Sequence, residues 1–164
     1  MKTLNQAGLL LLVVLVVNGN VLAQTHTAQS PSSSTKTLCS EINKIKSVPF
    51  YDSDKGTDKV YQQFLKQGEK MIPCLIENIT NVSVMKDPRL APAMHNFKVG
   101  DTSYTILCRI ARIPFEQMLP DEIRQRMKKE GIYAYFDFVD NNENRVLLRD
   151  YWKKWYAEHT KKTK

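Results

Sequence analysis

The chain has 164 residues, with 24 Lys and Arg against 17 Asp and Glu, and its formal net charge is +7. Residues 8–17 form an apolar run whose length of about ten residues suits a signal-peptide core and is too short to span a bilayer, which takes ~20. No second long apolar run follows, so we expect no transmembrane segment in the mature chain. The remaining length suits one domain, residues 37–160.

The N-terminal residues have the pattern of a cleaved signal peptide, residues 1–23. Lys2 supplies the positive start, and Val21 and Ala23 stand at the −3 and −1 positions, which predicts cleavage after Ala23. An uncleaved membrane anchor is the alternative. Residues 24–36 are rich in Ser, Thr and Gln and are expected to form a flexible leader, because they cannot bury enough apolar surface to offset their ordering entropy.

Six segments carry apolar residues at helical spacing and are expected to be helices: 38–48, 57–68, 69–80, 100–111, 120–131 and 142–159. Thr57 and Asp101 are candidate N-caps, and Gly68 is a natural C-terminal stop. The start of the last helix could be capped by Asn142 or Asn144. Residues 161–164 form a basic tail.

One segment, residues 132–140, suits either a helix or a strand. Its aromatic residues alternate as they would in a strand, yet no second strong strand candidate exists to satisfy its backbone. We therefore expect a helix, and the fold class becomes all-α, a small antiparallel helical array.

Three cysteines remain after the signal peptide: Cys39, Cys74 and Cys108. In an oxidising compartment two of them can pair, although the sequence does not fix which. We favour a disulfide between Cys39 and Cys74, since both lie near the starts of predicted helices that could pack side by side. Cys108 would then be a buried apolar residue.

Residues 58–111 resemble a HEAT-type pair of helices. In that family a helix ends at Gly, a Pro-containing helix follows and an Asp-containing loop precedes the next helix; the matching positions are Gly68, Pro73, Leu75, Ile76 and Asp87. The motif "DPR…AP…VGD" is also similar to small exported proteins of unassigned function in Gram-negative bacteria. That resemblance implies a periplasmic setting and no activity.

The connection between the third and fourth predicted helices is about nineteen residues long, which is uncommon in a compact domain and often functional. Its working part is the 85–101 loop, stiffened by prolines. Arg89 suits a carboxylate or phosphate, His95 could titrate near neutral pH, and Phe97 could be an exposed anchor or a peg into the core. Structural roles compete with each: Arg89 could pair with Asp87, and capping would account for Asp101.

No catalytic or cofactor motif is found, and no metal site is expected, since His26 and His159 are placed in tails. The C-terminal segment from Arg145 onward is basic and aromatic, and it includes Arg149, Lys153 and Lys154. It could bind anionic envelope polymers, or its aromatic residues could simply pack on the core. Nucleic acid is not an expected partner, because no binding module is recognised.

Three functions remain from different classes. The first is a non-catalytic module, inhibitor-like or immunity-like, that binds another exported protein through Asp87, Arg89, His95 and Phe97. The second is an envelope-associated structural protein that uses the basic C-terminal helix. The third is a hydrolase with a site around His95, together with Asp87 or Asp101.

Overall fold

The computed structural model describes residues 33–49, 58–89 and 96–162. These ranges contain helices and one isolated bridge, so the predicted all-α class is confirmed. The helices are α1 (Ser33–Cys39), η1 (Ile42–Lys44), α2 (Lys59–Gln67), η2 (Gly68–Met71), α3 (Ile72–Asn78), α4 (Val99–Ala111), α5 (Asp121–Glu130), α6 (Tyr133–Asp140) and α7 (Asn142–Lys162). The predicted signal peptide, its cleavage after Ala23 and residues 24–32 of the leader lie outside the described residues.

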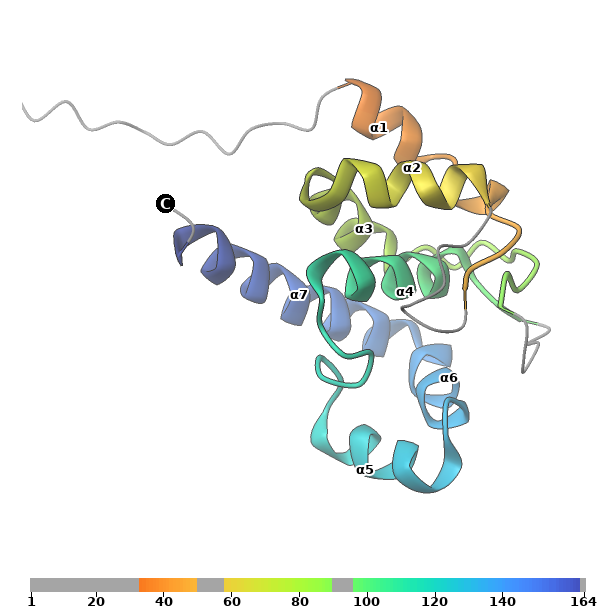
Figure 1. The fold of residues 1–164 in the computed structure, drawn as a ribbon. Helices are drawn as coiled ribbons and strands as arrows, with labels where there is room; N and C mark the ends of the chain where they lie inside the picture. The colour runs from red at the N-terminus through yellow and green to blue at the C-terminus, as the bar shows by residue number, and fades with distance from the viewer. Residues whose placement is uncertain (1–32, 50–57, 90–95, 163–164) are drawn as a thin grey trace, which may run out of the picture.

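The helices α3 and α4 form the centre of the fold. They pack against each other, α2 lies beside α4, and α7 crosses α3 and α6 (Figure 1). The helices α5 and α6 pack as a pair at one end of the molecule. The resemblance to HEAT repeats stays a prediction.

An aromatic cluster joins α4, α6 and α7. The ring of Tyr104 stacks on Tyr135 at 5.3 Å between centroids and meets Phe115 and Trp152 edge-on at 4.8 and 6.2 Å. Tyr104, Tyr135 and Trp152 are almost completely buried. Such pairs add about 0.5–1.5 kcal/mol each beyond the area they bury, so this cluster fixes the three helices against one another.

The first predicted helix is wrong in its boundaries. The helix α1 begins at Ser33, inside the predicted leader, and ends at Cys39. Residues 45–49 are not helical because partners elsewhere take their backbone groups: the N–H of Lys46 donates to the Asp58 carboxylate and that of Val48 to the carbonyl of Pro88. Ile45 and Val48 are buried nonetheless.

Both ends of α2 and the start of α7 are capped by the kinds of residue that the sequence predicts, but the observed N-caps differ from the predicted ones by one or more positions. The N-cap of α2 is Asp58, whose carboxylate accepts from the N–H of Tyr61, while the predicted cap Thr57 lies outside the described residues. Gly68 ends α2 with φ of 57°, as expected. The first turn of α7 is capped by Asn141, which accepts from the N–H of Glu143, rather than by Asn142 or Asn144. Since α7 reaches Lys162, it includes the first half of the predicted tail.

The structure joins Cys39 and Cys74 by a disulfide, with 6.3 Å between their Cα atoms, which is the pair that the sequence favours. The reason differs in part, because Cys39 ends α1 instead of starting a helix. Cys108 is an unpaired, buried thiol in α4, and burial raises its pKa well above the ordinary value. Across the described ranges, no helix has both the length and the apolar composition needed to cross a bilayer.

Candidate functional site

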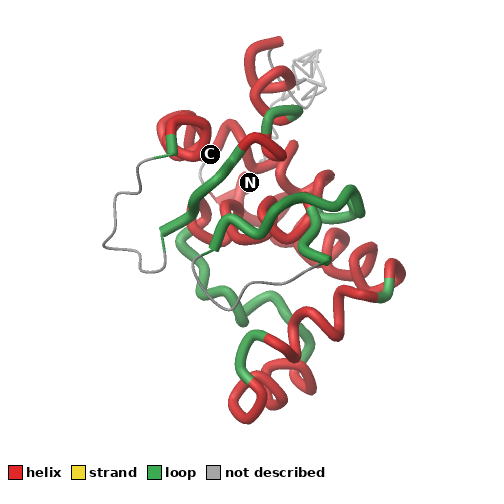
Figure 2. The backbone as a smooth tube through the Cα atoms, turned by 90° about the vertical axis from the view of Figure 1, so that its right-hand side faces the viewer, coloured by secondary structure: helices red, strands yellow, loops and turns green. Residues whose placement is uncertain are grey.

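The two ends of the long connection are joined by backbone hydrogen bonds. The N–H of Met85 donates to the carbonyl of Phe97 and that of Val99 to the carbonyl of Ser83, both at 2.9 Å, around an antiparallel bridge between Val84 and Lys98. Figure 2, in which loops are green, shows the described parts of the connection on the face of the molecule turned toward the viewer, in front of helices. Its described part is therefore held by the fold, as the prolines suggest.

Three of the predicted binding residues meet in one cluster. Arg89 forms a bidentate ion pair with Asp87: Nη2 donates to Oδ2 at 2.6 Å and Nε donates to Oδ1 at 2.9 Å. The same guanidinium lies over the rings of Phe97 and Phe136, 5.0 and 4.6 Å from their centroids. The ion pair with Asp87 and the contact with Phe97 hold the connection to itself, and the cation–π contact with Phe136 ties it to α6.

This cluster faces inward. The Asp87 side chain is 3% exposed and that of Arg89 is 16% exposed. Phe97 is almost completely buried, so it is the peg into the core and not an exposed anchor. His95 lies outside the described residues. Asp87, Arg89 and Phe97 are therefore brought together, but as an internal clamp.

The surface of the connection is formed by other residues. Val82 and Val84 are exposed, at 44% and 67%, and Lys86 is exposed beside them. The backbone groups of Ser83 and Met85 face Phe97 and Val99, so those of Val84 and Lys86 point the other way. Neither Val84 nor Lys86 makes a hydrogen bond to any described residue. We call residues 82–86 the open edge.

Asp101 is not the N-cap of α4, and capping does not explain it fully. Lys98 is the N-cap, and its N–H donates to Oδ2 of Asp101 at 2.9 Å. The other oxygen, Oδ1, pairs with Nη2 of Arg145 at 2.9 Å and accepts from the hydroxyl of Tyr135 at 3.2 Å. Both charged side chains are 2% exposed. Burial raises the pKa of Tyr135 well above its usual range, and the Asp101 carboxylate raises it further.

This buried pair corrects two expectations. Arg145 does not belong to the exposed basic surface of the C-terminal helix, because it reaches inward to Asp101 and donates to the carbonyl of Ile79. Asp101 and Asp87, the carboxylates considered for a hydrolytic site, are each held by an arginine. Both carboxylates are occupied by their arginines: the pair of Asp101 and Arg145 joins α4 to α7, and the pair of Asp87 and Arg89 lies within the connection.

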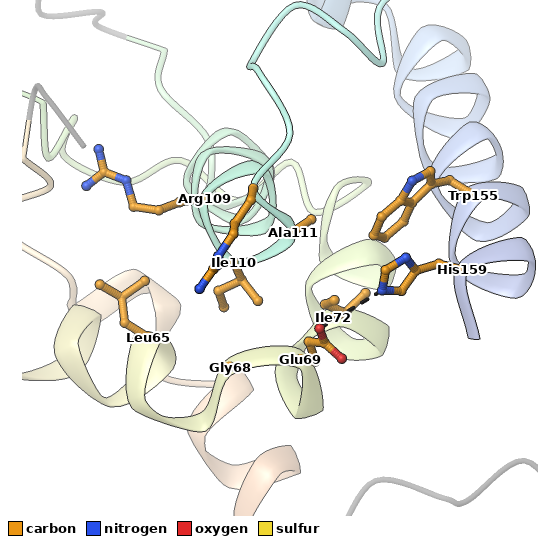
Figure 3. A pocket seen from close by; sticks show the side chains of 10 residues that line it. Leu65, Gly68, Glu69, Ile72, Arg109, Ile110, Ala111, Trp155 and His159 are labelled. Carbon is orange, nitrogen blue, oxygen red and sulfur yellow. Dashed lines mark ion pairs between the residues drawn. The ribbon is translucent and has the colours of Figure 1, made fainter. Parts of the chain in front are cut away.

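The structure also contains a groove that the sequence reasoning did not predict. A groove of about 530 Å³ lies between η2, the last turn of α4 and α7 (Figure 3). His159, predicted in a tail, is in α7: its Nε2 is 4.0 Å from Oε1 of Glu69, and its ring stacks on Trp155 at 4.7 Å. Arg109 donates to the hydroxyl of Tyr61 at 2.6 Å. The basic and aromatic composition near residue 159 was the only feature of the sequence that pointed to this groove.

Neither the clamp nor the groove carries a metal-ligand set: in the ranges that the structure describes, no group of three His, Cys, Asp or Glu could hold a metal ion. Comparison of the chain with protein-family models, with curated proteins and with solved structures found no match. Function must therefore be argued from the surfaces themselves.

Proposed function

We propose that the protein is an exported, non-catalytic binding module, inhibitor-like or immunity-like, that holds another exported protein through its long connection. The observation that carries this proposal is the open edge. Among the described residues this extended segment is paired on one side only, and such a segment offers N–H and C=O groups to an incoming strand, which is the geometry of β-strand addition.

The partner that fits this edge is an extended segment of a protein. The exposed side chains of Val82 and Val84 lie two residues apart and so share one face, where they would contact apolar side chains of the added strand. Lys86 follows on the same edge, and the chain is basic overall, which favours an acidic residue at that end of the partner.

The edge is held in place before any partner arrives. Residues 87–89 follow the open edge and are held in two ways. Arg89 pairs with Asp87, and the carbonyl of Pro88 accepts from the N–H of Val48. A surface that is already ordered loses less conformational entropy on binding. The disulfide between Cys39 and Cys74, together with the predicted signal peptide, supports export.

The alternative of an envelope protein that binds polymers through its basic C-terminal helix has less support. Arg145 is buried, Arg149 pairs with Asp150, and Lys153 pairs with Glu77. The positive charge of α7 is therefore smaller at the surface than the sequence suggests.

The test is an affinity capture from envelope extract with residues 24–164, comparing the wild type with Val82→Lys/Val84→Lys. Val146→Lys is the matched control, because Val146 is a similarly exposed valine on α7, at 41%. We expect one stoichiometric partner that is retained by the control and lost by the edge variant, with unchanged thermal unfolding of all three proteins.

The mode of binding has its own readout. Amide hydrogen exchange of Val84 and Lys86 is expected to be fast in the free protein and slowed in the complex, because strand addition occupies these groups. Equal capture by the edge variant, or no capture by the wild type, would refute the proposal.

A further inference from the structure

The groove of Figure 3 has the size of a ligand site, and its lining combines apolar and charged side chains. Its volume of about 530 Å³ is within the ~300–1,000 Å³ of small-molecule pockets. Leu65, Ile72, Ile110 and Ala111 give it apolar walls, and Trp155 adds an aromatic surface on the α7 side. Polar groups enter from three different elements: Glu69 from η2, Arg109 and Arg112 from the end of α4, and His159 from α7.

The charge in the groove is biased toward cations. Its single carboxylate, that of Glu69, lies against His159, and Arg109 and Arg112 also line the groove. Arg112 makes no side-chain hydrogen bond or ion pair with any residue that the structure describes. A guanidinium on the wall of a partly apolar groove is suited to a carboxylate, which it can bind with two parallel hydrogen bonds.

The backbone of Arg112 gives an independent reason to single it out. It caps α4 in the left-handed conformation, with φ of 56° and ψ of 40°. The two other positive-φ residues among the described ones, at the ends of α2 and α5, are Gly68 and Gly131. Left-handed backbone costs free energy for any residue with a Cβ, and such strain is concentrated at functional positions. Glycine would be the more stable residue here, yet the chain places an arginine at the groove.

From these observations we infer that the groove binds an organic anion with an apolar body. The carboxylate of the ligand pairs with Arg112, and its apolar part lies against Ile110 and Trp155. Two sources share this chemistry: a free aromatic or aliphatic acid, and the C-terminal residue of a polypeptide. The site is separate from the open edge and does not depend on the function proposed for it.

The decisive variant is Arg112→Gly. It removes the guanidinium and also relieves the backbone strain, so the Tm is expected to rise, by about 2–4 °C, while affinity for the anion falls about tenfold or more. A purely structural residue would not shift the two quantities in opposite directions. Lys154→Ala is the matched control, since Lys154 is an exposed cation of α7 that does not line the groove.

The probes are benzoate and a short peptide ending in phenylalanine with a free carboxylate, each compared with its neutral amide. Binding is measured by calorimetry and by the fluorescence of Trp155. Binding of both acids, lost in Arg112→Gly and kept in Lys154→Ala, supports a site for carboxylates in general. Binding of the peptide acid alone assigns the site to chain termini, and binding of benzoate alone assigns it to small acids. If neither acid binds at millimolar concentration, if the amides bind equally well, or if Arg112→Gly binds as the wild type does, the inference is wrong.

Discussion

Replacing Arg145 by methionine is expected to destabilise the fold severely. Methionine keeps much of the length of the side chain but removes the cation that faces Asp101 at 2.9 Å. The carboxylate would retain the N–H of Lys98 and the hydroxyl of Tyr135, with almost no access to water. Breaking a buried ion pair on one side costs about 3–5 kcal/mol, because an uncompensated charge is left inside.

That loss is large beside the total stability of a small domain, about 5–15 kcal/mol. It can be measured by urea unfolding followed by the fluorescence of Trp152, which is fully buried. The control is Arg149→Met, which breaks an ion pair with the more exposed Asp150 and should cost less than about 1 kcal/mol.

A second variant tests whether the loss of stability comes from the uncompensated charge of Asp101. In Asp101→Asn/Arg145→Met the buried charge disappears with its partner, so the double variant should be more stable than Arg145→Met alone. If Arg145→Met cost less than about 1 kcal/mol, or if the double variant were worse than the single one, the reasoning from buried charge would be refuted.

Removing the disulfide with Cys39→Ser/Cys74→Ser should lower the free energy of unfolding by about 4 kcal/mol, since the bond links residues 35 positions apart and restricts the unfolded chain; urea unfolding measures the loss. Gly100→Ala should cost more than about 2 kcal/mol in the same assay, because its Cβ would overlap a backbone carbonyl and come within 2.8 Å of Nη1 of Arg145. Stability should also fall as the pH rises above about 8.5–10: burial raises the pKa of Tyr135 and Cys108, so the folded chain keeps protons that the unfolded chain releases. Urea midpoints between pH 8 and pH 11 would show the decline, at about 1.4 kcal/mol per pH unit for each group.

Each of these predictions has a result that would contradict it. A disulfide-free protein within about 1 kcal/mol of the wild type would show that the unfolded chain is already compact. Gly131→Ala, where the added Cβ meets open space, should cost only about 1 kcal/mol through its positive φ, and a Gly100→Ala variant no worse than this would exclude the close approach. Urea midpoints that stay constant to pH 11 would show that the two buried groups titrate alike in both states.

Sequence reasoning succeeded where one segment carries its own signals. The helix α5 has acidic residues in its first turn, Lys128 and Lys129 in its last turn, and Gly131 after it, so its limits follow from local chemistry. The helical state of residues 132–140 also followed, from the lack of a strand partner. The limits of α5 need no knowledge of the rest of the chain, and the helical state of residues 132–140 needs only the absence of a second strand candidate in the sequence.

It failed where the role of a residue is set by a distant partner. Asp101 has the sequence position of a capping residue, and only the arrival of α7 supplies Arg145 as its counterion. Arg89 and Phe97 were singled out as binding residues, but no local pattern predicts that the guanidinium of one lies over the ring of the other. The open edge was missed because alternation over Val82 and Val84 is too short to stand out from a loop.

The buried pair of Asp101 and Arg145 also makes the fold of the first half of the chain depend on α7, which is synthesised later. A chain that emerges with its N-terminus first presents both partners of the disulfide, Cys39 and Cys74, well before it presents Arg145. The disulfide can therefore form before Arg145 is available to pair with Asp101. A chain that lacks Arg145 leaves that carboxylate without its cation, so we expect proteases to cleave it faster than a chain that contains α7.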